Sequence, residues 1–118
     1  MTFYDSSGRA IAYCDNNDVI YTFGGIPAAY VYGDAVYSFN GKQLGWTADG
    51  WIRDLNGLCV FFSEQATGFG PITPVKHVCP VKCVKQVVPV KAVRQVRRIK
   101  PVSNLNWSRL SGPVFFVQ

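Results

Sequence analysis

The chain has 118 residues, of which 48% are hydrophobic, 14% aromatic and 16% charged. This apolar content excludes an intrinsically disordered chain, and the length predicts a single domain over residues 1–118 with a modest core. The net charge of +5 hides two opposed halves, because all seven acidic residues lie within residues 1–70 and residues 71–118 carry only basic ones. Such asymmetry indicates either an anionic partner or attraction between the halves, within one chain or between copies.

The N-terminal residues do not resemble an export signal. No basic start followed by an apolar run precedes Tyr13, and no stretch approaches the ~20 apolar residues of a membrane span. We therefore expect a cytoplasmic protein without a membrane span. In that compartment the four cysteines, Cys14, Cys59, Cys79 and Cys83, are expected to be free thiols.

Residues 1–70 contain a repeat of 16 or 17 residues that is set by four glycines: Gly8, Gly25, Gly41 and Gly57. Three residues after each glycine is an aliphatic side chain: Ile11, Ala28, Leu44 and Val60. Five residues after it is an aromatic one: Tyr13, Tyr30, Trp46 and Phe62. Three residues before it is a short polar one: Asp5, Thr22, Ser38 and Asp54. The residue before that is Tyr in the first three units and Arg53 in the fourth.

Each unit carries two turn signals and two short strand-like runs. Dipeptides such as Asn40-Gly41 supply the positive φ angles of tight hairpins, and a second turn signal such as Asp49-Gly50 follows about eight residues later. The runs between the turns are rich in aromatic and β-branched residues, which is typical of strands. The pattern predicts an all-β fold, with an antiparallel meander of about eight short strands from four hairpin repeats.

Residues 71–104 follow a different repeat, in which an aliphatic residue recurs every three positions. The next residue is usually Lys or Arg, and Pro74, Pro80, Pro89 and Pro101 punctuate the run. An α-helix or a strand has the wrong period, whereas polyproline II has three residues per turn and tolerates proline. We expect an extended, polyproline II-like segment, with a strand covered on both faces as the competing interpretation, and a C-terminal tail over residues 105–118.

The length of this segment limits how it can fold. At ~3.1 Å per residue, its 28 residues from 75 to 102 would reach roughly 87 Å, while a compact chain of this size has a radius of gyration of about 13–14 Å. It must bend at its prolines, wrap the sheet or run along other chains. Burial of the aliphatic stripe favours a homo-oligomer in which these residues pack together or lie on a neighbouring meander.

The residues that could carry chemistry each have a structural interpretation as well. The aromatic column, Tyr13, Tyr30, Trp46 and Phe62, fits a sugar- or choline-type ligand site but is more typical of a core. The basic segment lacks the interleaved aromatic residues of a single-strand nucleic-acid site, so nucleic-acid binding is disfavoured. His77, Cys79 and Cys83 lack a CxxC pair, so no metal or other cofactor is expected. The single histidine lies within the triplets and the acidic residues lie at turns, which disfavours an enzyme.

The order of motifs resembles a known family. The motifs that carry the resemblance are Tyr37-Ser38-Phe39, Gly41-Lys42, Leu44-Gly45-Trp46, Asp49-Gly50-Trp51-Ile52-Arg53-Asp54, Gly57, the valine triplets, Trp107-Ser108 and Leu110-Ser111-Gly112. Together they are similar to the bacterial 4-fold β-flower domain, from which Cys79 and Cys83 depart. The resemblance implies an all-β bacterial protein and brings no catalytic residues. A weaker similarity, through Leu44-Gly45-Trp46 and Gly50-Trp51, is to cell-wall-binding repeats that hold choline or glucan.

The sequence thus predicts a non-catalytic structural or protein-interaction module that self-associates. The family name fits four repeats or four copies, so a tetramer is one of the expected oligomers; other protein partners are unknown. The residues expected to mediate self-association are Val75, Val78, Val81, Val84, Val87, Val90, Val93, Val96, Ile99 and Val102. The alternatives are the aromatic ligand site and, behind it, anion or nucleic-acid binding through the basic half.

Overall fold

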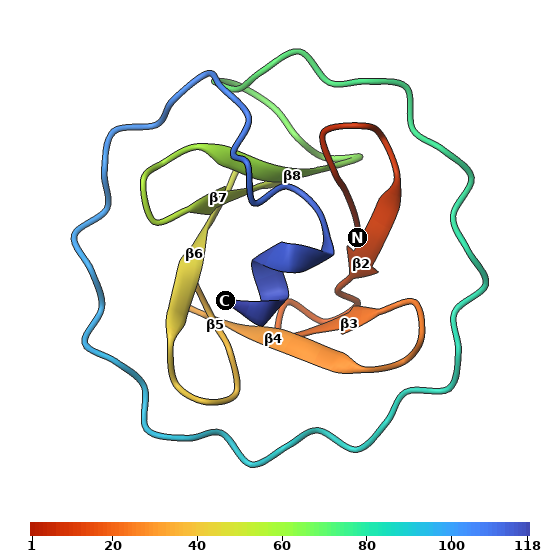
Figure 1. Cartoon of the computed structure of the whole chain (residues 1–118), viewed down its shortest axis with the longest axis vertical. Coiled ribbons are helices and arrows are strands. Elements are labelled where there is room, and N and C mark those ends of the chain that lie inside the picture. The colour runs from red at the N-terminus through yellow and green to blue at the C-terminus, as the bar shows by residue number, and fades with distance from the viewer.

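The computed structural model describes residues 1–118 and has eight antiparallel strands that close into one barrel (Figure 1). The strands are β1 (Thr2–Tyr4), β2 (Ala10–Tyr13), β3 (Val19–Thr22), β4 (Pro27–Tyr32), β5 (Ala35–Tyr37), β6 (Gln43–Ala48), β7 (Trp51–Asp54) and β8 (Cys59–Ser63). Each strand pairs with the next along the chain, and β8 pairs with β1 through Phe3–Ser63 and Tyr4–Phe62. The predicted meander is confirmed, and its closure leaves the sheet without a free edge.

The four glycine hairpins have the same backbone. In the β1–β2 hairpin, the Gly8 N–H donates to the Asp5 carbonyl at 3.0 Å and the Asp5 N–H to the Arg9 carbonyl at 2.9 Å; the same pair of bonds recurs in the other three hairpins. The glycine φ angles lie between 84° and 92°. Three members of the short polar column, Asp5, Thr22 and Asp54, accept backbone N–H groups of their turns; Asp5 Oδ1, for example, accepts from the N–H groups of Ser7 and Arg9 at 2.9 and 3.0 Å.

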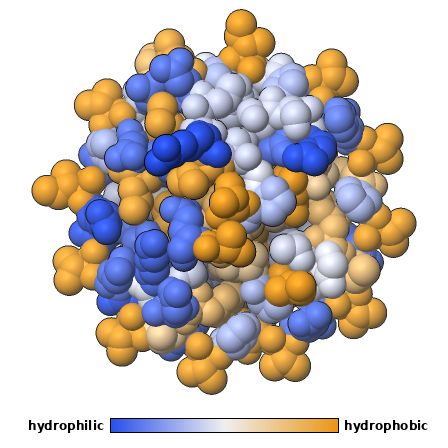
Figure 2. Space-filling model, viewed as in Figure 1, coloured by the Kyte–Doolittle hydropathy of each residue, from blue (hydrophilic) through white to orange (hydrophobic).

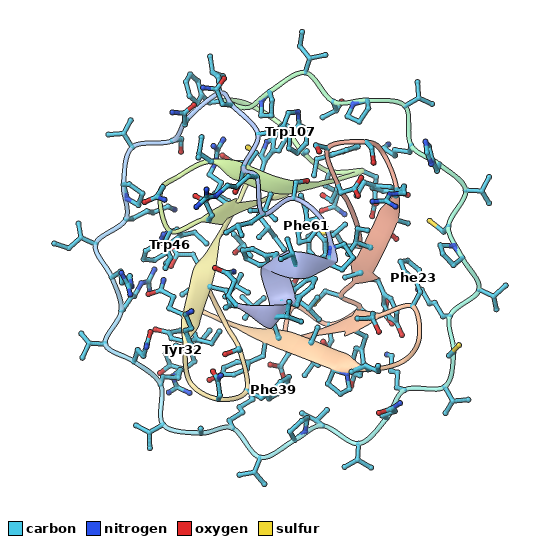
Figure 3. All side chains as sticks on the ribbon, viewed as in Figure 1. Phe23, Tyr32, Phe39, Trp46, Phe61 and Trp107 are labelled. Atoms are coloured by element: carbon cyan, nitrogen blue, oxygen red, sulfur yellow. The ribbon has the colours of Figure 1, made fainter.

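Two further residue columns fill the barrel interior. Five residues before each glycine is a buried apolar residue: Phe3, Ile20, Val36 and Ile52. Four residues after it the side chains are small in three units, and the fourth unit has Phe61. The ring of Phe61 packs against Phe115 and Phe116, with ring centroids 5.6 and 5.5 Å apart. Figure 3 shows Phe61 directed toward the C-terminal turn at the centre of the barrel.

Residues 71–104, hereafter the belt, run around the outside of the barrel as a ring (Figure 1). They contain no helix and no strand, and the outward side chains recur every three residues, as in polyproline II. The molecule is a disc of 36 × 36 × 22 Å with a radius of gyration of 13.2 Å. Of the three predicted arrangements, the belt adopts the one that wraps the sheet.

The length of the belt matches the size of the disc. A circle 36 Å across has a circumference of about 113 Å, so a quarter of it is about 28 Å, and nine polyproline II residues at ~3.1 Å each also span about 28 Å. A stretch of nine belt residues therefore reaches from one hairpin to the next. The belt needs this full extension to encircle the barrel.

The C-terminal tail leaves the belt and enters the barrel. It first lies beside β8, where the Ser108 N–H donates to the Cys59 carbonyl at 2.7 Å. It ends in a 3₁₀ helix, η1 (Pro113–Val117), whose Phe115 is fully buried in the core. None of the helical structure is long and apolar enough to cross a membrane.

Candidate functional site

The belt is attached to the barrel mainly through one edge. The third residue of every triplet from His77 to Asn104 either donates its backbone N–H to the barrel or is a proline, which has none. Six donate to hairpin carbonyls, at 2.8–3.1 Å: His77, Cys83, Gln86, Ala92, Gln95 and Asn104. The Arg98 N–H donates to Gln43 Oε1 at 2.9 Å, and the prolines are Pro80, Pro89 and Pro101. The prolines thus stand where the belt needs no donor.

Each hairpin glycine is a docking point for the belt. The carbonyl groups of Val75, Val84, Val93 and Val102, nine residues apart, lie against Gly8, Gly25, Gly41 and Gly57 respectively. A Cβ atom on any of these glycines would overlap the facing valine carbonyl. The glycines are therefore required by the belt as well as by their positive φ angles. We call each glycine with its facing valine carbonyl a station.

The second residue of the triplet turns its basic side chain toward the barrel. The Lys82 ammonium lies 4.3 Å from the centroid of Tyr13, the Lys91 ammonium 4.5 Å from that of Tyr30, and the Arg97 guanidinium 5.1 Å from that of Trp46. In the fourth unit, Phe62 stacks on Tyr4 instead and contacts Trp107. Each residue of the predicted aromatic column is thus only 1% exposed between barrel and belt, and a ligand would have to displace the belt to reach it.

Acidic residues at the opposite turns pair with the same basic side chains. Asp15 contacts Lys82 and Lys85 at 3.6 and 3.0 Å, Asp18 contacts Lys91 at 3.7 Å, and Asp34 contacts Arg97 and Lys100. The hydrogen bond from Lys85, which outweighs the opposing effect of burial, lowers the pKa of Asp15, and the same bond raises the pKa of Lys85. The charge asymmetry of the sequence therefore reflects attraction within one chain.

The first residue of each triplet points away from the barrel. Ile72 begins this series one triplet before the predicted stripe, which continues from Val75 to Val102. We call these eleven residues the rim: Ile72, Val75, Val78, Val81, Val84, Val87, Val90, Val93, Val96, Ile99 and Val102. Their exposed fractions range from 86 to 96%. Figure 2 shows them as separate apolar projections around the disc, and Figure 3 shows their side chains pointing outward. Within one chain, the stripe that the sequence predicted to be buried is in solvent.

Arg53 joins the two ends of the belt. This residue is 3% exposed, and its guanidinium donates to three backbone carbonyls: Gly57 at 2.8 Å, Asn104 at 2.8 Å, and Phe69. Phe69 lies just before the belt and Asn104 is its last residue. The break in the Tyr column at Arg53 marks this closure, which the sequence pattern alone did not explain.

The cysteines and the histidine do not converge on a site. All four cysteines are unpaired, and no group of three His, Cys, Asp or Glu residues is placed to hold a metal ion. Cys79 Sγ lies 3.3 Å from Tyr4 Oη. That hydrogen bond, with burial, raises the pKa of Tyr4 to about 12.

A cavity of about 390 Å³ opens at the end of the barrel opposite η1. Its wall includes Phe3, Cys14, Val31 and Trp51, with Asn17 at the surrounding turns. The lining is mostly apolar side chains and turn backbone, without a set of converging catalytic groups. The extended belt surface is therefore the stronger candidate site.

The residues that sequence reasoning missed share one signal, a period of nine. Stations on the belt recur every nine residues, while stations on the barrel recur every 16 or 17. Comparing the two periods would have matched the third residues His77, Gln86, Gln95 and Asn104 to the four glycines. The three-residue period alone did not indicate which edge faced the barrel.

Among the comparisons with known proteins, one family model matches the chain. Searches of the curated proteins and of the solved structures give no match. The family model described as 4-fold beta flower protein matches residues 1–116, which include all eight strands, the belt and most of η1. The four stations give that description a structural meaning within a single copy. The chain belongs to the 4-fold β-flower protein family.

Proposed function

We propose that this protein is a non-catalytic interaction module that self-associates through its rim. The observation that carries the proposal is the rim itself, eleven branched aliphatic residues that are 86–96% exposed around the whole disc. Single exposed apolar residues are normal on a protein surface, but eleven in one regular ring are not, and this concentration supports an interaction site. The basic side chains at the second position of the triplets are turned inward onto aromatic rings and carboxylates, so they do not separate the rims of two approaching copies.

The shape of the rim predicts how copies associate. Two convex discs touch along a short arc, so one contact contains few valines and is smaller than a standard stable interface. Each disc has free rim on its other sides and can contact further copies. We expect weak, multivalent association whose average mass rises with concentration.

A second explanation for the valines is conformational and must be separated from the first. Branched side chains restrict the backbone to extended conformations, so valine could serve only to keep the belt straight. Threonine is also β-branched but replaces a methyl group with a hydroxyl group. A variant with Val84→Thr, Val87→Thr, Val90→Thr and Val93→Thr therefore keeps the conformational effect and removes much of the apolar contact.

The test is size-exclusion chromatography with light scattering over a range of concentrations. The native chain should show a mass above that of the monomer at tens of micromolar. The threonine variant keeps seven apolar rim residues, so it should show a lower average mass at the same concentration, with an unchanged circular dichroism spectrum. A native chain that stays monomeric refutes the proposal. Equal association of both chains would show that the valines act only on belt conformation.

The structure does not favour the alternative functions. The aromatic column is covered by the belt, and Lys82, Lys85, Lys91, Arg97 and Lys100 are paired with carboxylates. Ligand binding at the aromatic column would require the belt to be displaced, and nucleic-acid binding through these five side chains would require their ion pairs to be broken.

A further inference from the structure

One quarter of the disc has a pocket between the barrel and the belt. The pocket has a volume of about 520 Å³ and lies beside β4 and β5. Tyr32 and Tyr37 line it from the barrel, Lys91, Arg94 and Arg97 line it from the belt, and it has no acidic residue in its wall. Of the four cavities in the protein, it is the only one that includes belt residues. Figure 3 shows Tyr32 in this position, between the barrel wall and the belt.

Comparison of the four units shows what is different about this quarter. The residue that follows each docking valine is, in belt order, Lys76, Lys85, Arg94 and Ser103. The matching barrel residue lies seven positions after the glycine of the neighbouring hairpin, which gives Glu64, Asp15, Tyr32 and Ala48 in the same order. The two lysines are therefore matched with acids and the serine with a neutral residue. Arg94 is the one basic residue of this series that meets a neutral partner.

The Arg94 guanidinium is held against tyrosine without an ion pair. Its central carbon lies 3.7 Å from the centroid of the Tyr32 ring, whereas the equivalent Lys85 ammonium lies 3.0 Å from Asp15 Oδ2. Hydrogen bonding to the Tyr30 hydroxyl, which outweighs the opposing effect of burial, raises the pKa of Arg94. The pocket thus contains a positioned and charged guanidinium whose planar set of donors suits an oxyanion.

The neighbouring charges favour an anion that carries two negative charges. Lys91 pairs with Asp18 at 3.7 Å, and a single carboxylate, Asp34, serves both Arg97 and Lys100. Together with the guanidinium described above, four basic groups face two carboxylates, so two positive charges are uncompensated. A phosphate monoester carries a charge of about −1.5 to −2 at pH 7, whereas a carboxylate carries one negative charge.

We propose that this pocket binds a phosphate group, either as the free ion or as a monoester, and that Arg94 is the residue that anchors it. Two N–H groups of the guanidinium donate to phosphate oxygens. Lys91 and Arg97 keep their carboxylate partners and add positive potential. The Tyr32 ring, which is 53% exposed, offers a surface for the organic part of a monoester. The belt stays in place and the rim stays exposed, so this site is independent of rim association.

The test is a titration of the ¹⁵N-labelled full-length chain with inorganic phosphate, with sodium chloride added to keep the ionic strength constant. The amide resonances of residues 91–97 should shift and saturate, and acetate should shift them much less. Phenyl phosphate distinguishes the two sources of the phosphate group. Tighter binding of phenyl phosphate would assign the site to a monoester, and equal or weaker binding would assign it to the free ion.

Two variants and one control connect the binding to Arg94. Arg94→Gln removes the guanidinium, and Tyr32→Asp supplies the carboxylate that Lys85 has in the neighbouring unit. Each should weaken phosphate binding about tenfold or more, the effect of losing one hydrogen bond to a charged group. Lys85→Gln loses the same charge about 28 Å away along the belt, where screening is nearly complete, and should change the affinity less than about twofold.

Both variants alter side chains at the barrel surface, and circular dichroism should show that they fold as the native chain does. Phosphate shifts that do not saturate would overturn the proposal. So would equal phosphate affinity of the native chain and a folded Arg94→Gln variant, because the anion would then be held by general charge. Acetate binding as tight as phosphate binding would overturn the assignment of a phosphate group.

Discussion

At the scale of single residues, the hairpin glycines show why one position can satisfy two constraints. Gly41 has a φ of 92° and lies against the Val93 carbonyl, whereas Gly68 has a φ of 75° and a Cβ atom added there would have no neighbour within 4 Å. Gly24 has neither constraint, since the nearest atom to an added Cβ would be Thr22 Oγ1 at 3.7 Å. Substitution of these three glycines therefore distinguishes the cost of backbone strain from the cost of losing contact with the belt.

We expect Gly41→Ala to lower the free energy of unfolding more than Gly68→Ala does. Both variants incur the left-handed strain of about 1–2 kcal/mol, but only Gly41→Ala also displaces the belt. Gly24→Ala should stay within about 0.5 kcal/mol of the native chain. Urea unfolding followed by tryptophan fluorescence measures all three, and equal losses for Gly41→Ala and Gly68→Ala would contradict a role for the belt.

Arg53 holds the two ends of the belt together through its guanidinium group. Arg53→Met removes the guanidinium donor from three carbonyls, of which Gly57 keeps the Asn104 N–H. Hydrogen bonds to charged groups are worth about 1.5–3 kcal/mol each, so we expect a loss of about 3 kcal/mol or more. The start of the belt should also loosen, which accelerates chymotrypsin cleavage after Phe69. Arg9→Met is the control, because the Arg9 side chain is 63% exposed in its pair with Asp5. Unchanged cleavage in Arg53→Met would show that the belt ends are held by other contacts.

At the scale of elements, the belt is held by charge pairs that depend on pH. The pKa of Asp15 is lowered from 3.8, so its contribution is present above that value and is lost as pH falls through the folded pKa. The pKa of Lys85 is raised from 10.5, so its contribution is complete below that value and is lost as pH rises through the folded pKa. The belt should therefore be attached most firmly between about pH 4 and pH 10.

Amide exchange at Gln86, corrected for the intrinsic effect of pH, measures this attachment, because the Gln86 N–H donates to the Gly25 carbonyl. Exchange should increase a few-fold toward both pH limits. Asp15→Asn should raise exchange at neutral pH to nearly the acidic level, while Asp49→Asn, at a turn without an ion pair to the belt, should not. A profile that is flat in the native chain would exclude the ion pairs as attachments.

The C-terminal 3₁₀ helix is the element that completes the barrel core. Phe115 is fully buried and packs on Phe61, so Phe115→Ala should cost about 3–5 kcal/mol. Phe69→Ala is the matched control, because Phe69 is 57% exposed and its removal should cost less than about 1 kcal/mol. Thermal unfolding by circular dichroism compares the two. Similar midpoints would show that the barrel is stable without η1.

The sequence predicted the elements better than it predicted their packing. Glycine and Asp/Asn turn residues are local signals, so the eight strands and four hairpins could be placed without knowing the fold. The belt was harder, because polyproline II has three edges and the sequence alone does not say which one is inward. The sequence predicted that the valines are buried between copies, which stays a prediction. Within one chain they face solvent, because the Lys and Arg side chains cover the aromatic rings while their charged ends reach carboxylates. The role of Arg53 could not be predicted because its partners come from the two ends of the belt.

At the scale of the whole molecule, the exposure of the rim predicts that a single copy folds without burying the rim side chains. Val84→Asp with Val90→Asp should leave the stability of the monomer within about 1 kcal/mol of native, since both side chains are at least 90% exposed. Val60→Asp is the contrasting variant, because Val60 is fully buried and a charge there should unfold the barrel. Far-ultraviolet circular dichroism distinguishes the outcomes. Unfolding of the rim variant would mean that the rim is buried in the native assembly.

The match between nine belt residues and one hairpin has a consequence for how such a chain can change length. A fifth hairpin would widen the disc, and the belt could close around it only with about nine more residues. Removing a single triplet would leave the ring about 9 Å short, and the two ends could no longer meet at Arg53. An insertion or deletion in the barrel therefore requires a matching change in the length of the belt. The two can only vary together, with three triplets of belt for each hairpin of barrel.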